Sequence, residues 1–255
     1  YKPAQTLAEG RYVLLSDMDR RMELDVAGDT GDIPNETNVQ IWKNTAPSRY
    51  NSFDVVKGAN GYYKLIHAAS GKALDLYNGG TGLQNNISLH DQNGNIAQDW
   101  AIISEGRDSY VIWSRRSGMV MDVEYAKTAN GTNVSQCTYN GGANQKWHFV
   151  RAEHSVTYNL MGGQDGPEKQ TKYYMSDLKL SSTVPKRKGY VFKGWNSSSG
   201  YNGKVYQAGS TYSNDADITL YAAWVAQGSE MTSGYDRVLP DGDYVIASSK
   251  NSVYY

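Results

Sequence analysis

The sequence predicts a mainly β protein, and three observations lead to this fold class. The 255-residue chain has 21 tyrosines and 26 glycines but only 3 phenylalanines, a balance that suits strands, turns and aromatic surfaces better than long helices. A Gln-x-Trp triplet recurs at an interval of 47 residues. Short alternating apolar segments are separated by Gly, Asn and Asp turns at the same spacing, which is typical of strands in an all-β fold.

Charge and cysteine content exclude several classes of protein. The formal net charge of −1 provides no broad field for nucleic acid or an anionic membrane. A single cysteine, Cys137, leaves no internal disulfide framework. No apolar run approaches the roughly 20 residues that a membrane span requires. We therefore expect neither nucleic-acid binding nor membrane insertion.

The first part of the chain consists of three blocks with a common pattern. Each block begins with an apolar segment, and an apolar-Asp-apolar step follows, with its carboxylate at Asp25, Asp75 or Asp122. A shared step beginning with Asn comes next, at Asn38, Asn86 and Asn133. The closing triplets are Asn51-Ser52-Phe53, Gln98-Asp99-Trp100 and Gln145-Lys146-Trp147. Because no single block can bury so large a ring alone, we expect Phe53, Trp100 and Trp147 to share one core.

These three blocks resemble the ricin B-type β-trefoil lectin domain, which is also classed as a carbohydrate-binding module. The resemblance extends from about Leu7 to Arg151 and assigns residues 1–152 to this domain. It implies three strand repeats closed around a pseudo-threefold axis, with the triplet aromatics in the shared core. The cysteine pairs of plant relatives are missing, which places the resemblance on the bacterial side.

The resemblance also implies which side chains contact a sugar. A carboxylate accepts hydrogen bonds from two hydroxyls, an aromatic ring offers a flat apolar platform, and Asn or Gln both donates and accepts. Carried over residue by residue, the carbohydrate-binding set is Asp25, Trp42, Asn44 and Asn51 in the first block, Asp75, His90 and Gln98 in the second, and Asp122, Tyr139, Asn144 and Gln145 in the third. No block matches the family pattern completely: the Asp25-to-Trp42 gap is 17 rather than 15, and Tyr50, Ala97 and Cys137 replace expected residues.

A second interpretation of the same residues stays open. An Asp at a strand end often caps a turn, and the triplet Gln often bonds the backbone of its own repeat. The function that we predict is glycan binding by a non-catalytic lectin module. The alternative is a structural or protein-interaction segment of a surface adhesin, without sugar binding.

Residues 153–226 show a different pattern. The order Gly-Tyr-x-Phe-x-Gly-Trp, from Gly189, followed by Thr-Leu-Tyr-Ala-x-Trp, from Thr219, closely resembles the Listeria–Bacteroides repeat. The resemblance implies a small β-grasp-like spacer module with possible protein contacts. Its apolar residues predict a small core, formed by Tyr190, Phe192, Trp195, Tyr221 and Trp224.

Residues 227–255 begin with a polar, glycine-bearing linker. Gly242-Asp243-Tyr244-Val245 then repeats the pattern of Gly10-Arg11-Tyr12-Val13. We expect the first strands of a possible second trefoil here; a tail that packs on the spacer is the alternative. The abrupt ends and the missing signal peptide suggest a fragment of a larger bacterial protein, secreted or attached to the cell surface, that binds host or plant polysaccharide or glycoprotein.

No residue pattern indicates an enzyme. Asp29-Thr30-Gly31 matches the aspartic-protease tripeptide, but a carboxylate dyad needs two copies and the chain has one. Gly-x-Ser-x-Gly, His-Glu-x-x-His and P-loop motifs are missing from the sequence. The four histidines show no metal-ligand spacing. We therefore predict no catalytic residue, no metal and no cofactor.

Overall fold

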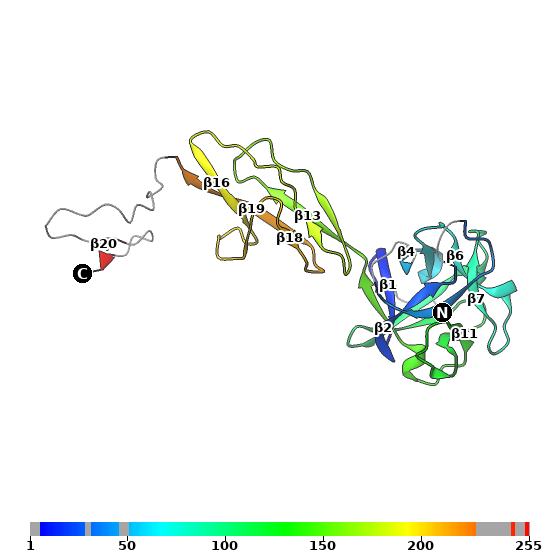
Figure 1. Ribbon diagram of the computed structural model, residues 1–255. Helices are drawn as coiled ribbons and strands as arrows, with labels where there is room; N and C mark the ends of the chain where they lie inside the picture. Colours follow the sequence, from blue (N-terminus) through cyan, green and yellow to red (C-terminus); the bar gives the residue numbers. More distant parts are fainter. Residues whose placement is uncertain (1–5, 29–31, 46–50, 228–245, 248–252, 255) are drawn as a thin grey trace, which may run out of the picture.

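The structure, a computed structural model, describes residues 6–28, 32–45, 51–227, 246–247 and 253–254. Within these ranges the regular elements are strands and short 3-10 turns, which confirms the mainly β fold class. Figure 1 shows strands β1 to β12 in one rounded body and β13 to β19 in a second, narrower one. Asp29-Thr30-Gly31, Tyr50 and nearly all of residues 228–255 lie outside the described residues.

The first body is a twelve-stranded sheet with four strands from each block. The first block contributes β1 (Gly10–Ser16), β2 (Asp19–Val26), β3 (Thr37–Lys43) and β4 (Phe53–Lys57). The second contributes β5 (Tyr63–His67), β6 (Ala73–Leu76), β7 (Ile87–His90) and β8 (Trp100–Gly106). The third contributes β9 (Ser109–Ser114), β10 (Val120–Val123), β11 (Thr132–Cys137) and β12 (Trp147–Arg151).

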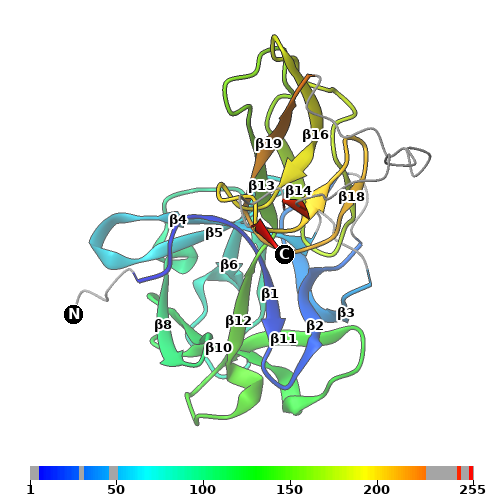
Figure 2. The ribbon, with the colours of Figure 1, turned by 90° about the vertical axis from the view of Figure 1, so that its left-hand side faces the viewer.

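The pairing of these strands produces a barrel with a cap. Six strands close a ring in the order β1, β4, β5, β8, β9 and β12, and β12 returns to β1 by pairing Tyr12 with Arg151. Figure 2 shows β1 and β12 side by side. The other six strands form three hairpins, and β3 bonds to both β7 and β11. A barrel of six strands capped by three hairpins is the β-trefoil that the resemblance implied.

The predicted core is confirmed. Phe53, Trp100 and Trp147 are completely buried in one cluster of apolar side chains contributed by all three blocks. The indole Nε1 of Trp100 donates to the carbonyl of Leu74 at 3.0 Å, so this buried donor is satisfied. The three blocks therefore share one apolar core.

Three asparagines join the hairpins near the pseudo-threefold axis. Asn86 donates from Nδ2 to Oδ1 of Asn38 at 2.8 Å, and Asn133 donates from Nδ2 to Oδ1 of Asn86 at 3.0 Å. A carboxamide carries both donor and acceptor, so one residue type repeated in each block can form a chain of bonds. The Asn step of each block is thus part of the scaffold.

The second body is a mixed five-stranded sheet in the order β14, β13, β19, β16 and β17, with β15 and β18 paired beside it. Its strands are β13 (Glu153–Asn159), β14 (Gln170–Tyr173), β15 (Leu178–Lys179), β16 (Tyr190–Asn196), β17 (Val205–Tyr206), β18 (Thr211–Tyr212) and β19 (Ile218–Ala226). Near the end of the chain β20 (Ile246–Ala247) pairs with β21 (Val253–Tyr254).

The core of this second body differs in part from the prediction. Trp195 is completely buried, Phe192 packs against it at 5.0 Å between ring centroids, and Trp224 packs against Phe192 at 5.7 Å. Tyr190 was predicted to be in the core, but its side chain is exposed and lies beneath the guanidinium of Arg187 at 4.0 Å. The phenol hydroxyl can form hydrogen bonds with water, so a tyrosine at the start of a strand can remain exposed.

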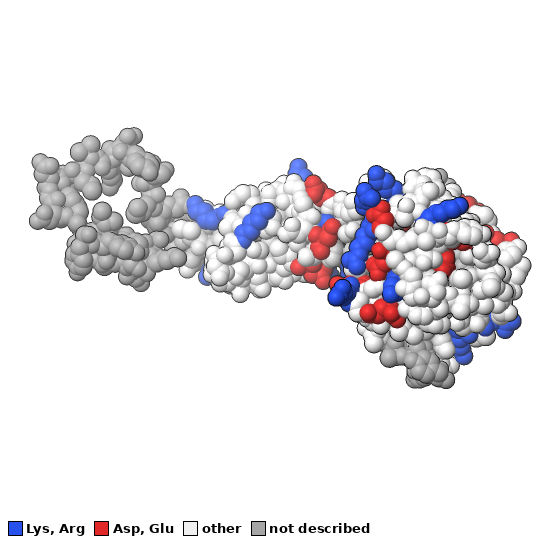
Figure 3. All heavy atoms as spheres, turned by 90° about the horizontal axis from the view of Figure 1, so that it is seen from below, with Lys and Arg blue, Asp and Glu red and all other residues white. Residues whose placement is uncertain are grey.

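Only Ala152 lies between β12 and β13. Its amide donates to the carbonyl of Arg11, and its carbonyl accepts from the amide of Tyr174, each at 2.9 Å. The guanidinium of Arg11 bonds Asp54 of the first body and Glu153 of the second. Figure 3 shows basic and acidic groups side by side where the two bodies meet. Backbone and side-chain bonds therefore connect the bodies directly.

Candidate functional site

The register of the hairpins places three carboxylates at equivalent positions. Asp25, Asp75 and Asp122 lie opposite Gln40, Ser88 and Ser135 on the neighbouring strand. Strand alternation turns the flanking apolar residues into the core, so the Asp side chains point away from it. Each residue is only 6 or 7% exposed, and Asp25 and Asp75 each line a hollow of the surface.

The same register explains the unequal Asp-to-aromatic gaps. Trp42, His90 and Cys137 all lie two residues beyond the position opposite the Asp. The chain between the paired residues Val26 and Val39 is two residues longer than that between Leu76 and Ile87, so the gap of 17 and the gap of 15 reach equivalent places.

The first site is a hollow of about 230 Å³ beside Asp25. Trp42 is 43% exposed at its rim, so the indole lies outside the core, as a platform requires. Gln40, which the sequence analysis missed, lines the hollow and donates from Nε2 to Oδ2 of Asp25 at 2.8 Å. Asn51 also lines it, whereas the half-buried Asn44 does not. Gln40 lies opposite Asp25 in the hairpin, so pairing the two strands in the sequence would have identified it as a site residue.

An ionisable group lies directly behind this site. Glu23 is 2% exposed and accepts a hydrogen bond from Nδ2 of Asn51. Burial raises the pKa of Glu23 from 4.5 to about 8; the bond from Asn51 opposes this rise and the charge of Asp25 adds to it. The carboxyl of Glu23 is therefore largely protonated at neutral pH.

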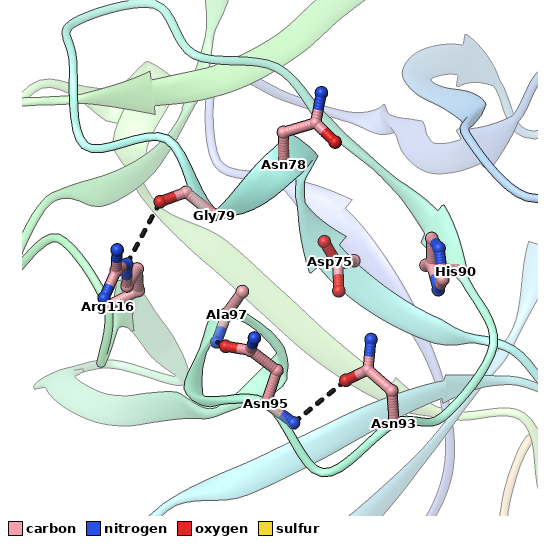
Figure 4. A pocket seen from close by; sticks show the side chains of 8 residues that line it. All are labelled: Asp75, Asn78, Gly79, His90, Asn93, Asn95, Ala97 and Arg116. Carbon is pink, nitrogen blue, oxygen red and sulfur yellow. Dashed lines mark hydrogen bonds between the residues drawn. The ribbon is translucent and has the colours of Figure 1, made fainter.

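The second site is a hollow of about 260 Å³ around Asp75, shown in Figure 4. It is lined by Asp75, Asn78, Gly79, His90, Asn93, Asn95, Ala97 and Arg116. Burial raises the pKa of Asp75, and a hydrogen bond from Gln98 opposes the rise. His90 lies at one side of Asp75 and Arg116 at the other. Only His90 and Asp75 of this lining were predicted.

In the third site the carboxylate is held by two amides. Asn144 and Gln145 both donate to Oδ2 of Asp122, at 2.9 and 2.8 Å. No described residue donates to the other oxygen, which leaves it for a hydroxyl. The ring of Tyr139 contacts Trp113 at 5.3 Å between centroids, and its hydroxyl donates to Glu105 at 3.0 Å.

The structure corrects the prediction that Gln98 and Gln145 contact a sugar. Both side chains are completely buried. Gln98 donates to the carbonyl of Asp91 at 2.9 Å and accepts from the amide of Asn93 at 3.2 Å. Gln145 likewise accepts from the backbone of Asn140 at 2.8 Å. Each glutamine bonds the backbone of its own repeat and supports the adjacent Asp, which is the structural alternative considered for them.

One further position was missed in all three blocks. Gly28, Asn78 and Tyr125 each lie three residues after the Asp and have positive φ angles of 78°, 51° and 55°. Gly28 and Asn78 line the first and second hollows. Tyr125, at the equivalent place in the third block, is 71% exposed. The third site thus has an exposed aromatic ring near Asp122, although Cys137 occupies the usual platform position.

Within the described ranges, no cluster of three or more His, Cys, Asp or Glu side chains is suited to holding a metal ion. None of the helical segments described is long and apolar enough to span a bilayer.

Comparison with known proteins gives two family matches. The model of the ricin-type β-trefoil lectin domain-like family matches residues 49–136 and 97–169, and that of the Listeria-Bacteroides repeat domain matches residues 154–223. Both matches confirm the resemblances stated from the sequence. No curated protein sequence matches the chain.

Solved structures extend this comparison. The designed threefold-symmetric protein ThreeFoil is 34% identical, with a TM-score of 0.52 over 55% of this chain and 98% of its own. An exo-β-1,3-galactanase from Clostridium thermocellum, 1,3Gal43A, is 28% identical with a TM-score of 0.52; the match covers 56% of this chain but only 30% of the enzyme. The Rhizoctonia solani agglutinin shares the fold at 20% identity and a TM-score of 0.51, over 57% of this chain and 97% of its own.

Proposed function

Because the N-terminal part of this chain belongs to the ricin-type β-trefoil lectin-like family, we propose that it binds glycans at the hollows beside Asp25 and Asp75 and at the surface beside Asp122. One observation carries the proposal. Three carboxylates lie at threefold-equivalent positions, and each has polar or aromatic side chains near it that the core does not require.

The first site has the chemistry that a sugar needs. The carboxylate of Asp25 accepts from vicinal hydroxyls, and charge-assisted bonds of this kind contribute about 1.5–3 kcal/mol each. Gln40 adds a donor and acceptor beside it. The exposed indole of Trp42 offers a flat surface to the C–H face of the ring.

We further propose a non-catalytic role within a larger bacterial protein that is secreted or attached to the cell surface. Residues 1–152 form the lectin module, residues 153–226 a spacer, and residues 227–255 a linker and the first strands of a second trefoil. The partners are host or plant polysaccharides or glycoproteins. Galactose-containing chains are the first choice of probe, since a segment of a galactanase is among the similar structures.

A glycan array followed by calorimetry tests the proposal. On the best neutral glycan, Asp25→Ala and Asp122→Ala should each weaken binding about tenfold or more, because each removes a hydroxyl acceptor. Asp75→Ala should weaken it less, since Ala97 and His90 replace the Asn and the ring platform there. Asp32→Ala, which removes an exposed carboxylate outside the hollows, is the control and should change nothing.

The alternative is a scaffold that contacts proteins and no sugar. It is favoured by the structural role of Gln98 and Gln145 and by Cys137 at the third platform position. A folded triple variant of the three Asp residues that keeps full glycan binding, or a wild-type chain that binds nothing on the array, would establish this alternative.

A further inference from the structure

We propose that the hollow around Asp75 selects an acidic sugar unit, one that carries a carboxylate beside its hydroxyl groups, and that Arg116 is the residue that selects it. The inference rests on the proposed glycan binding and adds the substrate class of one site. The first and third sites, by contrast, take neutral units.

The guanidinium of Arg116 is oriented by one hydrogen bond. Its Nε donates to the carbonyl of Gly79 at 3.1 Å, a bond drawn in Figure 4, and none of the described residues accepts from its two terminal nitrogens. Among the described residues it forms no ion pair, whereas its neighbour Arg115 pairs with Asp99 at 2.7 Å. A planar guanidinium presents two parallel donors that match the geometry of a carboxylate.

The arrangement of charges suits a ligand with two different ends. Asp75 lies in the middle of the hollow and Arg116 at its edge. A sugar hydroxyl can therefore donate to Asp75 while a ring carboxylate accepts from Arg116. His90 lies on the opposite side of Asp75 from Arg116. Asn78 and Asn93 provide amides for the remaining hydroxyls.

Arg116 has no basic counterpart at the equivalent turn position of the other two blocks. Arg116 lies in the turn between β9 and β10, where its amide donates to Oγ of Ser114 at 3.2 Å. Met18 occupies the same place in the first block, with its amide bonded to Oγ of Ser16 at 3.3 Å. Ala69 occupies it in the second block. Of these three residues only Arg116 is basic, and it lines the hollow around Asp75, which belongs to another block.

Lys43 is the basic residue of the first hollow, and it differs from Arg116 in two respects. Its charge contributes to the lowered pKa of Asp19, after the larger effect of Arg21, so its ammonium is near that carboxylate. An ammonium on a flexible stem also lacks the two-pronged geometry. The hollow beside Asp25 is therefore less suited to binding an acidic sugar unit.

Paired ligands test the inference. Binding of an oligogalacturonate and of its carboxyl-reduced, neutral form is measured by calorimetry, and the occupied site is located by amide chemical-shift changes around Asp75. A second pair, sialyl-lactose and lactose, tests the other common source of a sugar carboxylate. We expect wild-type protein to prefer the acidic member of at least one pair by about tenfold or more. The preference should weaken as salt increases.

Two substitutions locate the preference. Arg116→Gln should abolish it while leaving neutral-glycan binding at the other sites unchanged, because the side chain is exposed and supports no core contact. Arg107→Gln, which removes an exposed charge from the turn between β8 and β9, is the matched control and should retain the preference.

Equal binding of the acidic and neutral members in the wild-type protein would overturn the inference, as would a preference that survives Arg116→Gln. In either case, neutral glycans that still bind and depend on Asp25 would leave the proposed lectin function standing. Loss of all glycan binding in the wild-type protein would instead remove the function itself.

Discussion

The buried carboxyl of Glu23 predicts a specific pH dependence of stability. Its pKa is 4.5 in an unfolded chain and about 8 in the folded protein, where burial is the main cause. Between these pH values the unfolded chain has lost the proton and the folded chain retains it. The free energy of unfolding therefore falls as the pH rises through this interval, by about 1.36 kcal/mol per pH unit. Below pH 4.5 the full stability is present, and above pH 8 the loss is complete.

The interval of about 3.5 pH units sets an upper bound of about 5 kcal/mol on this loss. Glu23→Gln removes the ionisable group but keeps the shape and an oxygen that accepts from Asn51. We expect the variant to match the wild-type melting temperature at pH 4.5 and to exceed it by several degrees at pH 8. Other titrating groups are common to both proteins, so they cancel in the comparison.

Calorimetric melting of both proteins from pH 4.5 to 9 measures this difference. Glu36→Gln changes an exposed glutamate of the same domain and should show a constant, small difference across the range. A Glu23→Gln difference that does not change with pH would refute the reasoning, because it would mean that Glu23 ionises normally in the folded protein.

Three further predictions concern the buried core of the trefoil, the asparagines near its pseudo-threefold axis and the exposed ring near the third site. Trp147→Ala should lower the unfolding free energy by about 3–5 kcal/mol in denaturant titrations, since it empties the space of a completely buried ring; an unchanged midpoint would contradict this packing. Asn86→Ala should cost about 1–3 kcal/mol, because it breaks both hydrogen bonds that link the three asparagines and leaves Oδ1 of Asn38 without this donor. In a variant that lacks Asp25 and Asp75, Tyr125→Ala should weaken the remaining glycan binding severalfold without changing the melting temperature, since the ring is exposed. Binding that is indifferent to Tyr125 would leave the third site without an aromatic platform.

The repeat spacing in the sequence predicted which residues occupy equivalent positions in the three blocks. Two equal intervals of 47 residues relate Phe53, Trp100 and Trp147, and the structure places the three rings in one core. Periodicity also located Asp25, Asp75 and Asp122 at equivalent positions. It did not predict the direction of a side chain at the end of a short turn. Gln98 and Gln145 were therefore assigned to the sugar, although their amides bond backbone groups.

Contacts between blocks were also invisible to the repeat. Arg116 belongs to the third block but lines the hollow of the second, and no spacing within one block indicates this. Gln40 is opposite Asp25 only because the hairpin register places it there. Tyr190 illustrates a further limit, since a Gly-Tyr-x-Phe pattern does not determine which of its rings faces water.

The pairing of β1 with β12 has a mechanical consequence. These strands are antiparallel, so the polypeptide enters and leaves the trefoil at the same end of the pair, beside Tyr12 and Arg151. Tension on the two flanking segments would separate the strands from this end, one hydrogen bond at a time, and would not load all of their hydrogen bonds at once. At this end of the strand pair, Arg11 bonds Asp54 and Glu153, and the amide of Ala152 donates to the carbonyl of Arg11. The bonds between the two bodies therefore lie at the end of the β1–β12 pair where tension on the flanking segments would act.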